Sequence, residues 1–582
     1  MKKMQWDLTT LVKDEKTFDK NIEIINQELN TLKQEKTKTL NETLLLKLLK
    51  EKEKIKEESN KLLVYSSLRY YKNINDNNTF ILKTKAEEFN NEVDLKLQWI
   101  DEEIIKLGKE KIIEWIKKLE ALKKYEFYLK NLFRMQEHNI TEEENKRVKE
   151  NLNTINKKIA DYNSLIQNMK YKEIIINNKK IELTPINYAK YLQSRDKNTR
   201  KETYLSINKA YQEKKEEYAN ILDTIYKYRT ENAKMKNYSS VLEKELFEEN
   251  IDKQVIKTLI NSVTKNIPLI QKYFKIKTSL LKEKSPHLYD LNVPLDFKTS
   301  KKYTLEESVD IIKEALKPLG EEYLKVVEIL LDGHIDAEVE ENKYQGLIFS
   351  WHTYSFLNFK GSYVDIKNLI HELGHIVNYY FSMNEQTYFY EDSTVFIGEI
   401  ASIVNEILLN HYLLENAKTK EEKIFYLSKE IENYITSVFK QTMYTELEQE
   451  LYSIKEKENI SSDILSKKYI NIIKKYYGED IIYDDVEDVG WAKIGHLYRF
   501  CYYPYKYATG LLMASTVVNA IFYDNTLTKK EYINFLSSGS SNYSLELIKL
   551  LHIDFSNSKI IDRGFQILQK DIDLLSQLIE KE

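Results

Sequence analysis

The amino-acid sequence predicts a mostly α-helical protein, and three observations lead to this prediction. Only 13 Gly and 6 Pro occur among 582 residues, so few positions break a helix or form a tight turn. Leu and Ile recur at three- and four-residue spacing within strongly charged segments, for example through residues 44–49 and 112–116. Patterns typical of β-strands are short and few. A hydrophobic fraction of 42% also excludes wholesale disorder.

The first part of the chain, from about Glu15 to Lys170, is expected to form long, charged amphipathic helices without a chemical motif. A β-hairpin is expected next, because the short apolar runs 173–176 and 181–183 flank the turn-forming pair Asn177-Asn178. Thr184-Pro185 then opens a new helical stretch.

A domain boundary is predicted near this point, which gives an N-terminal helical domain over residues 1–190 and a second domain over 191–582. The second domain is expected to be helical to about Leu331. Two strand candidates follow, Gln345 to Trp351 and Tyr354 to Phe359. They predict a small β-sheet beside the helix that comes next.

A capping box indicates where that helix begins. Ser362 is followed three residues later by Asp365, a pattern in which two side chains satisfy the first amides of a helix. We therefore expect a helix that begins near Tyr363 and carries the segment 371–375 two to three turns later.

The segment 371–375 reads His-Glu-Leu-Gly-His and supplies most of the groups that a zinc hydrolase needs. His371 and His375 stand at i and i+4, so they project from one face of a helix and can share one metal ion. Glu372 leaves the helix at a different angle and is expected to take a proton from a metal-bound water, as a general base and not as a ligand. The alternative is a pair of satisfied core histidines, which this five-residue pattern disfavours.

A catalytic zinc ion has three protein ligands and keeps a fourth position for water, so one more donor is required. Glu399 is the best candidate, because a carboxylate in the apolar segment 398–402 is unexpected unless it is paired. Glu406 falls on the same helical face. It either holds a ligating His by its second ring nitrogen or is an ordinary surface Glu or core ion pair. Gly374 is unfavourable inside a helix, and close approach of the Glu399 helix is a reason to accept it.

An aromatic cluster begins at His496 and runs through several Tyr to residues 508–510. Phenol and imidazole donors can bind the oxyanion of a tetrahedral intermediate. Packing is nevertheless the default interpretation for most of them in a chain with 43 Tyr. The remaining histidines are scattered singly and are interpreted as structural or exposed: His138, His287, His334, His352, His411 and His552.

Composition excludes several classes of partner. Lys and Arg total 88 and Asp and Glu 92, so the net charge of −4 gives no reason to expect nucleic acid. The most apolar long window, residues 507–522, is interrupted by polar residues and is too short to span a membrane. The single Cys501 cannot form an internal disulfide, and the first residues lack the apolar core of a signal peptide. We expect a soluble cytoplasmic protein.

The sequence resembles the oligoendopeptidase F type of the thimet oligopeptidase-like (M3) zinc metallopeptidases. The central match is the segment 371–375, then 22 intervening residues, then residues 398–406, with the spacing and neighbouring residues of that family. Supporting matches run nearly end to end, at residues 6–8, 288–295, 315–320 and 505–510.

The resemblance implies a zincin-like fold in which two helical lobes face each other across a deep channel with one zinc ion on its floor. It also implies that the strand Tyr354 to Phe359 lines the channel and pairs with an extended peptide, a mode that reads backbone groups. Two departures are visible. Asn378 stands where relatives commonly have another His, and the interval from His496 to Tyr507 is slightly longer than the family pattern.

The same resemblance assigns roles to individual residues. It makes Glu372 the base, His371, His375 and Glu399 the zinc ligands, and His496, Tyr503 and Tyr507 candidates for stabilising the intermediate. We therefore expect a zinc endopeptidase that cuts internal bonds of short, unstructured oligopeptides.

Two rival functions stay open. One is a zincin of another type, a carboxypeptidase or an aminopeptidase, and the other is a catalytically silent helical scaffold that binds peptides. The same ligands also accept Mn or Co in place of Zn. The sequence gives no oligomeric state and no peptide preference.

Overall fold

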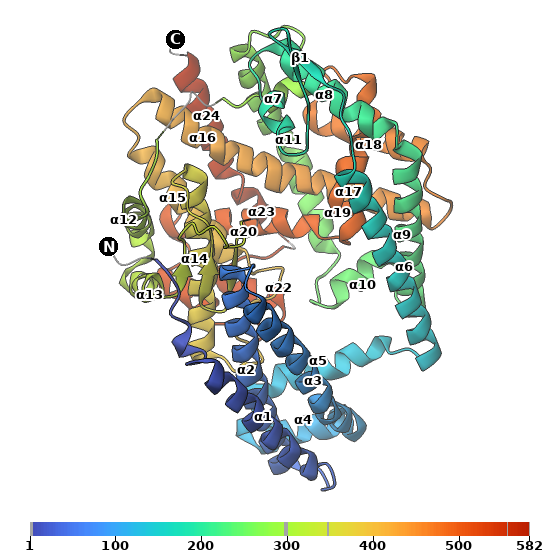
Figure 1. The fold of residues 1–582 in the computed structure, drawn as a ribbon, viewed down its shortest axis with the longest axis vertical. Coiled ribbons are helices and arrows are strands. Elements are labelled where there is room, and N and C mark those ends of the chain that lie inside the picture. The colour runs from blue at the N-terminus through green and yellow to red at the C-terminus, as the bar shows by residue number, and fades with distance from the viewer. Residues whose placement is uncertain (1–3, 296–300, 346–347, 556, 581–582) are drawn as a thin grey trace. The chain divides into compact units, whose positions relative to one another are not determined.

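The computed structural model describes residues 4–295, 301–345, 348–555 and 557–580, most of which lie in helices (Figure 1). The predicted fold class, mostly helical with small sheets, is confirmed. Every helix among these residues is too short or too polar to cross a bilayer. The chain divides into two compact units, each built from three separate segments.

The first unit comprises Met1–Glu137, Lys301–Leu409 and Thr526–His552. Its helices are α1 (Glu15–Glu35), α2 (Glu42–Lys72), α3 (Asn77–Leu107), α4 (Lys109–Lys118), α5 (Glu126–Met135), α12 (Leu305–Leu316), α13 (Glu321–Leu331), α14 (Tyr363–Glu385), α21 (Lys529–Leu536) and α22 (Ser544–Leu547). Its strands are β3 (Ile335–Asp336), β4 (Phe349–Trp351) and β5 (Tyr354–Phe356).

The second unit comprises His138–Ser300, Asn410–Asn525 and Ile553–Glu582. Its strands are β1 (Ile174–Ile176) and β2 (Lys179–Ile181). Its helices are α6 (Glu142–Gln167), α7 (Tyr188–Leu192), α8 (Lys197–Gln212), α9 (Lys215–Met235), α10 (Val241–Phe247), α11 (Gln254–Leu280), α16 (Lys420–Tyr434), α17 (Lys440–Lys455), α18 (Ser462–Tyr477), α19 (Gly495–Arg499), α20 (Pro504–Phe522), α23 (Ser558–Arg563) and α24 (Gln566–Glu580). The division falls within α15 (Ile400–Glu415).

Segments of the two units alternate along the chain, whereas the predicted boundary near residue 190 divides the chain only once. The interleaved division follows contacts between residues that are distant in sequence, and a composition pattern cannot reveal such contacts. The division into 1–190 and 191–582 stays a prediction.

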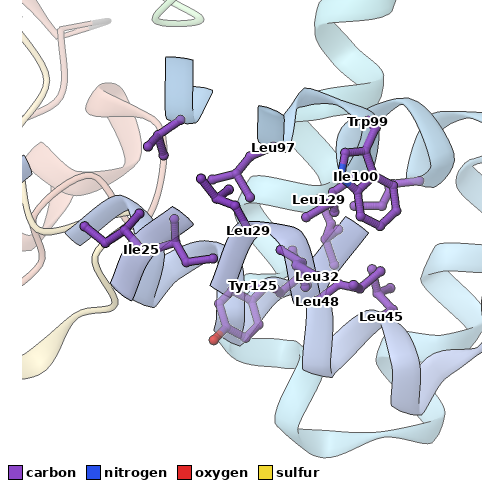
Figure 2. Packing of buried hydrophobic residues seen from close by; sticks show 14 of the residues in the cluster. Ile25, Leu29, Leu32, Leu45, Leu48, Leu97, Trp99, Ile100, Tyr125 and Leu129 are labelled. Atoms are coloured by element: carbon purple, nitrogen blue, oxygen red, sulfur yellow. The ribbon is translucent and has the colours of Figure 1, made fainter. Parts of the chain in front are cut away.

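Helices α1 to α5 share a hydrophobic core of their own. Its buried members extend from Val12 to Leu129, and Figure 2 shows Leu29, Leu48 and Ile100 among them. Phe389 is the one partly buried residue packed against this cluster that comes from a later part of the described chain. The charged amphipathic pattern of these helices is thus explained, because their apolar faces are buried against one another.

The hairpin predicted after the first helices is confirmed as β1 paired antiparallel with β2. Asn177 and Asn178 form its two-residue turn with φ of 50° and 62°. A turn with two positive φ values matches the right-handed twist of the strands, and Asn tolerates that conformation better than most residues.

The second sheet has the order β3-β5-β4, with β5 parallel to β3 and antiparallel to β4. Its strands are shorter than predicted, and residues 346–347 of the first candidate lie outside the described part of the chain. The expectation that residues 354–359 pair with a peptide is wrong. β5 is the central strand, and the amides of Leu357 and Phe359 already bond to carbonyls of Asp336 and Ala337. The edge strands are β3 and β4.

Candidate metal centre

The predicted motif helix is α14, which begins at Tyr363 as expected. Ser362 caps it, since its side chain accepts from the Asp365 amide at 3.2 Å while Asp365 accepts from the Ser362 amide at 2.8 Å. The helix packs against α13, α21 and strands β4 and β5 of the same unit. This packing holds α14 in place and so determines where its two histidines lie.

Three predicted ligands converge at that face. The Nε2 atoms of His371 and His375 are 3.1 Å apart, and Glu399 Oε2 lies 3.5 Å and 3.6 Å from them. Among the described residues these three form the one group whose donor atoms all lie within 4.8 Å of one another in a geometry able to hold a metal ion. Two imidazole nitrogens and one carboxylate oxygen are the donor set of many catalytic zinc sites, so the residues fit the expected ion.

Gly374 explains how Glu399 reaches the histidines. A Cβ at Gly374 would lie 2.5 Å from Cα and 2.8 Å from the amide nitrogen of Ser402. The first turn of α15 therefore packs directly on the backbone of α14, as the sequence suggested. Any larger residue would separate Glu399 from the two histidines.

Glu406 contacts the Nδ1 atom of His371. Its Oε1 is 2.6 Å from His371 Nδ1, and its Oε2 pairs with Lys367 Nζ at 3.0 Å. Burial favours a lower pKa for His371, but the hydrogen bond and charge of Glu406 raise that pKa to about 9 in the metal-free protein. Burial opposes ionisation of Glu406, and the charges of Lys367 and His371 nevertheless lower its pKa to about 2. The carboxylate therefore holds Nδ1 and leaves Nε2 directed toward the other ligands.

Glu372 lies at the wall of a cavity of about 450 Å3 that His371, His375 and Glu399 also line. The side chain is buried, and its Oε2 accepts a hydrogen bond from Ser350 Oγ at 2.5 Å. Ser350 belongs to the edge strand β4. The candidate base is thus oriented by the sheet and not only by its own helix.

Sequence reasoning missed three residues near this cavity. Lys367 precedes His371 by one helical turn, so helical spacing alone could have suggested it. Ser350 carries no local signal, because it reaches Glu372 only through the packing of β4 on α14. His352 was interpreted as structural or exposed, and it lines the cavity from the turn between β4 and β5 with a φ of 54°.

Asn378, which stands in place of the family's further His, has a structural role. Its side-chain amide donates to the Leu536 carbonyl at 2.9 Å, and its oxygen accepts from Ser393 Oγ at 3.0 Å. These bonds connect α14 to α21 and to the loop before Glu399.

His496, Tyr503 and Tyr507 belong to the second unit, where they form one aromatic cluster. The Tyr507 ring lies 5.8 Å from His496 and 5.2 Å from Tyr503, in edge-to-face contact with both. Burial, with the charge of nearby Arg499, lowers the pKa of His496, so its imidazole is neutral at pH 7. The three residues are grouped as predicted, and their role in catalysis stays a prediction.

Comparison with known sequences identifies the family. The sequence profile of peptidase family M3 matches residues 190–567, and a profile described as Oligopeptidase F matches residues 103–150. The chain belongs to peptidase family M3. The resemblance read from the motif is confirmed, and this M3 member is a metallopeptidase that hydrolyses peptide bonds.

Similar proteins cover this M3 peptidase nearly end to end. Oligopeptidase PepF of Bacillus subtilis is 26% identical over 99% of this chain and 87% of its own length, and the chromosomal oligoendopeptidase F of Lactococcus lactis subsp. cremoris is 27% identical over 99% and 98%. Among solved structures, a candidate peptidase from Chlamydophila abortus superposes with a TM-score of 0.91 at 29% identity, over 99% of this chain and 98% of that one. Oligoendopeptidase-F from Enterococcus faecium shares the fold, with a TM-score of 0.71 at 23% identity over 98% and 100%.

Proposed function

We propose that this M3 peptidase is a zinc-dependent endopeptidase that cleaves short, unstructured oligopeptides. The observation that carries the proposal is the convergence of His371, His375 and Glu399 on the cavity that also contains Glu372 and the edge strand β4. The names of the Bacillus and Lactococcus relatives, which describe an oligopeptidase and an oligoendopeptidase, support it.

Zinc held by His371, His375 and Glu399 would polarise a scissile carbonyl and lower the pKa of a bound water. Glu372 takes the proton from that water and delivers it to the leaving amine. Ser350 donates to Oε2 of Glu372 and keeps the carboxylate turned toward the cavity. We assign stabilisation of the oxyanion to donors among His496, Tyr503 and Tyr507.

The edge strand β4 accounts for a preference for extended, unstructured peptides. Its outer side has no partner strand in the described sheet, and Phe349 and Ser350 line the metal cavity. An extended substrate that pairs with this edge presents backbone groups in register and needs neither terminus. A folded protein does not offer such a strand.

The proposal is tested with one peptide sequence in two forms, blocked at both ends and free at both ends. The zinc enzyme is expected to cut both internally at the same bond, as read by mass spectrometry, and to leave the same sequence intact inside a stable folded protein. Glu372→Gln is the matched control. It keeps the shape of the carboxylate without its basicity and should lower turnover by about 10²- to 10⁴-fold with metal still bound.

The rivals give different results. Cleavage confined to the free peptide would favour a carboxypeptidase or aminopeptidase. Peptide binding without cleavage in the zinc-loaded protein would favour the silent scaffold. Activity with Mn or Co but not with Zn would mean that the ion is Mn or Co and that the same residues bind it.

A further inference from the structure

A second cavity, of about 520 Å3, lies entirely within the second unit. Its walls come from α7, α8, α11, α16, α17 and α18 and from the segments 288–294 and 490–494. The volume is in the range of pockets that bind small organic molecules. None of the predicted catalytic or metal residues lines it.

The charges that line this cavity are strongly unequal. Among the described residues that line it, Lys277, Lys429, Lys440 and Lys493 face one acidic residue, Glu432. Glu432 is already engaged, because Lys277 Nζ lies 3.4 Å and Lys429 Nζ 3.7 Å from its carboxylate oxygens. Glu432 therefore does not neutralise Lys440 and Lys493, the other two lysines of the lining.

Neither Lys440 nor Lys493 forms an ion pair with a carboxylate of the described chain. The Lys440 ammonium lies over the Tyr444 ring at 6.0 Å, and Lys493 donates to Asn208 Oδ1 at 2.6 Å. Enclosure by the protein, opposed in part by Glu487 and reinforced by the charge of Lys440, lowers the pKa of Lys493 to about 8. The charge of Lys440 thus acts on Lys493, and Glu487, whose charge partly offsets it, is not among the described residues that line the cavity.

The neutral polar groups of the walls add further donors. Tyr444, Tyr469 and Tyr477 also line the cavity, and no hydrogen bond joins their hydroxyls to another described residue. Burial raises the pKa of all three, so each keeps its proton at neutral pH. Ammonium and phenol groups that line one cavity, and of which none pairs with a carboxylate of the described residues, are complementary to an oxyanion.

Two irregularities of the backbone shape the same walls. A π-helical turn over Ile435–Phe439 interrupts the continuous run of α16 into α17, and Ile435 and Thr436 from it line the cavity. A Cβ at Gly490 would lie 2.3 Å from the Tyr469 ring, so glycine at this position leaves room for that ring. π-Helical turns are rare in α-helices and occur frequently at functional sites.

We propose that this cavity binds a small organic anion through phosphate or carboxylate groups held by Lys440 and Lys493, with Tyr444, Tyr469 and Tyr477 as further donors. The anion separates the two ammonium groups and neutralises their repulsion. The site is independent of the metal centre, and binding stabilises the folded protein by mass action.

Thermal unfolding of the full-length zinc enzyme tests the proposal, with sodium phosphate and sodium succinate as probes and sodium chloride at matched ionic strength as reference. One of the two probes should raise the midpoint in a saturable way beyond the chloride reference. The stronger probe identifies phosphate or carboxylate as the preferred group. In Lys440→Gln/Lys493→Gln the shift should fall at least threefold, while the variant without added anion unfolds no earlier than the wild type, because the repulsion is gone.

The matched control is Lys257→Gln/Lys467→Gln, which removes the same charge from exposed positions on α11 and α18. It should keep the wild-type shift. If the cavity variant does not fold, Lys440→Gln alone serves, since that ammonium lies over the Tyr444 ring and forms no ion pair with a described residue. Equal shifts in the wild type and both variants, or no shift with either probe, would overturn the proposal.

Discussion

At the scale of the residue, the two ring nitrogens of His371 have different partners. Nδ1 faces Glu406 at 2.6 Å, and Nε2 faces His375 and Glu399. Removing a metal ligand and removing the carboxylate that hydrogen-bonds to a ligand have different effects on metal binding, because the first group bonds to the ion and the second orients a ligand. This difference gives a test that separates Glu399 from Glu406.

We expect Glu399→Ala to lose most of its bound metal, whereas Glu406→Ala retains part of it, with affinity or activity reduced about 10- to 100-fold. Elemental analysis of both purified variants after dialysis against a defined zinc buffer gives the comparison. Full zinc content in Glu399→Ala would mean that another residue is the third ligand.

The individual site residues were predictable to different degrees. His371, Glu372 and His375 form a local pattern, and Glu399 stands out because a carboxylate is rare in an apolar segment. Ser350 and His352 were not predictable, since each reaches the cavity only after β4 and β5 pack on α14.

At the scale of the element, sequence patterns predicted those features that depend on residues close together in the chain. The hairpin turn and the capping box of α14 depend on residues within three positions of each other, and both are confirmed. Strand β3 has two residues and is defined by its pairing with β5, about twenty positions later in the chain. The charged cavity is formed by six helices at once, so no single segment indicates it.

Gly374 provides a test of the contact between α14 and α15. We expect Gly374→Ala to destabilise the protein by about 1 to 3 kcal/mol, because overpacking against the Ser402 backbone outweighs the higher helix propensity of Ala. Zinc affinity should fall as well, since Glu399 moves away with α15. Denaturant unfolding and zinc titration measure the two effects.

The control is Met383→Ala, on the exposed side of the same helix. It should change neither quantity appreciably. A Gly374→Ala protein as stable as the wild type would show that α15 shifts without strain.

At the scale of the whole molecule, partly buried neutral histidines make the protein sensitive to acid. Burial, with the charge of Lys61, lowers the pKa of His352 to about 4, and burial with the charge of Lys570 does the same for His411. The folded-state pKa lies below the usual value of 6.5, so the unfolded chain binds more protons between about pH 6.5 and 4. Stability therefore falls as the pH decreases through that window.

His411→Gln should remove one of these contributions. The loss of unfolding free energy between pH 7 and 4.5 is expected to be smaller than in the wild type by about 2 kcal/mol, because Gln does not protonate. Urea unfolding at the two pH values measures it. An unchanged dependence in His411→Gln would show that His411 is charged in the folded protein.

The interleaved units and the core of α1 to α5 predict how fragments behave. Residues 1–137 are expected to form a helical fragment with cooperative thermal unfolding, because their core is almost complete within the segment. Residues 191–582 should not unfold cooperatively, since the first unit then lacks α1 to α5. Circular dichroism of both fragments distinguishes this division from the single boundary near residue 190, which predicts a stable 191–582 fragment.

The self-contained core of α1 to α5 also has a consequence for synthesis on the ribosome. At roughly 5 to 20 residues per second, residues 138–300 take on the order of ten to thirty seconds to be made before the next segment of the first unit emerges. Helices associate far faster than that. A nascent chain that buries its first apolar faces during this interval does not expose them to other chains, and it presents a folded surface when helix α14, which carries the candidate metal ligands, leaves the ribosome.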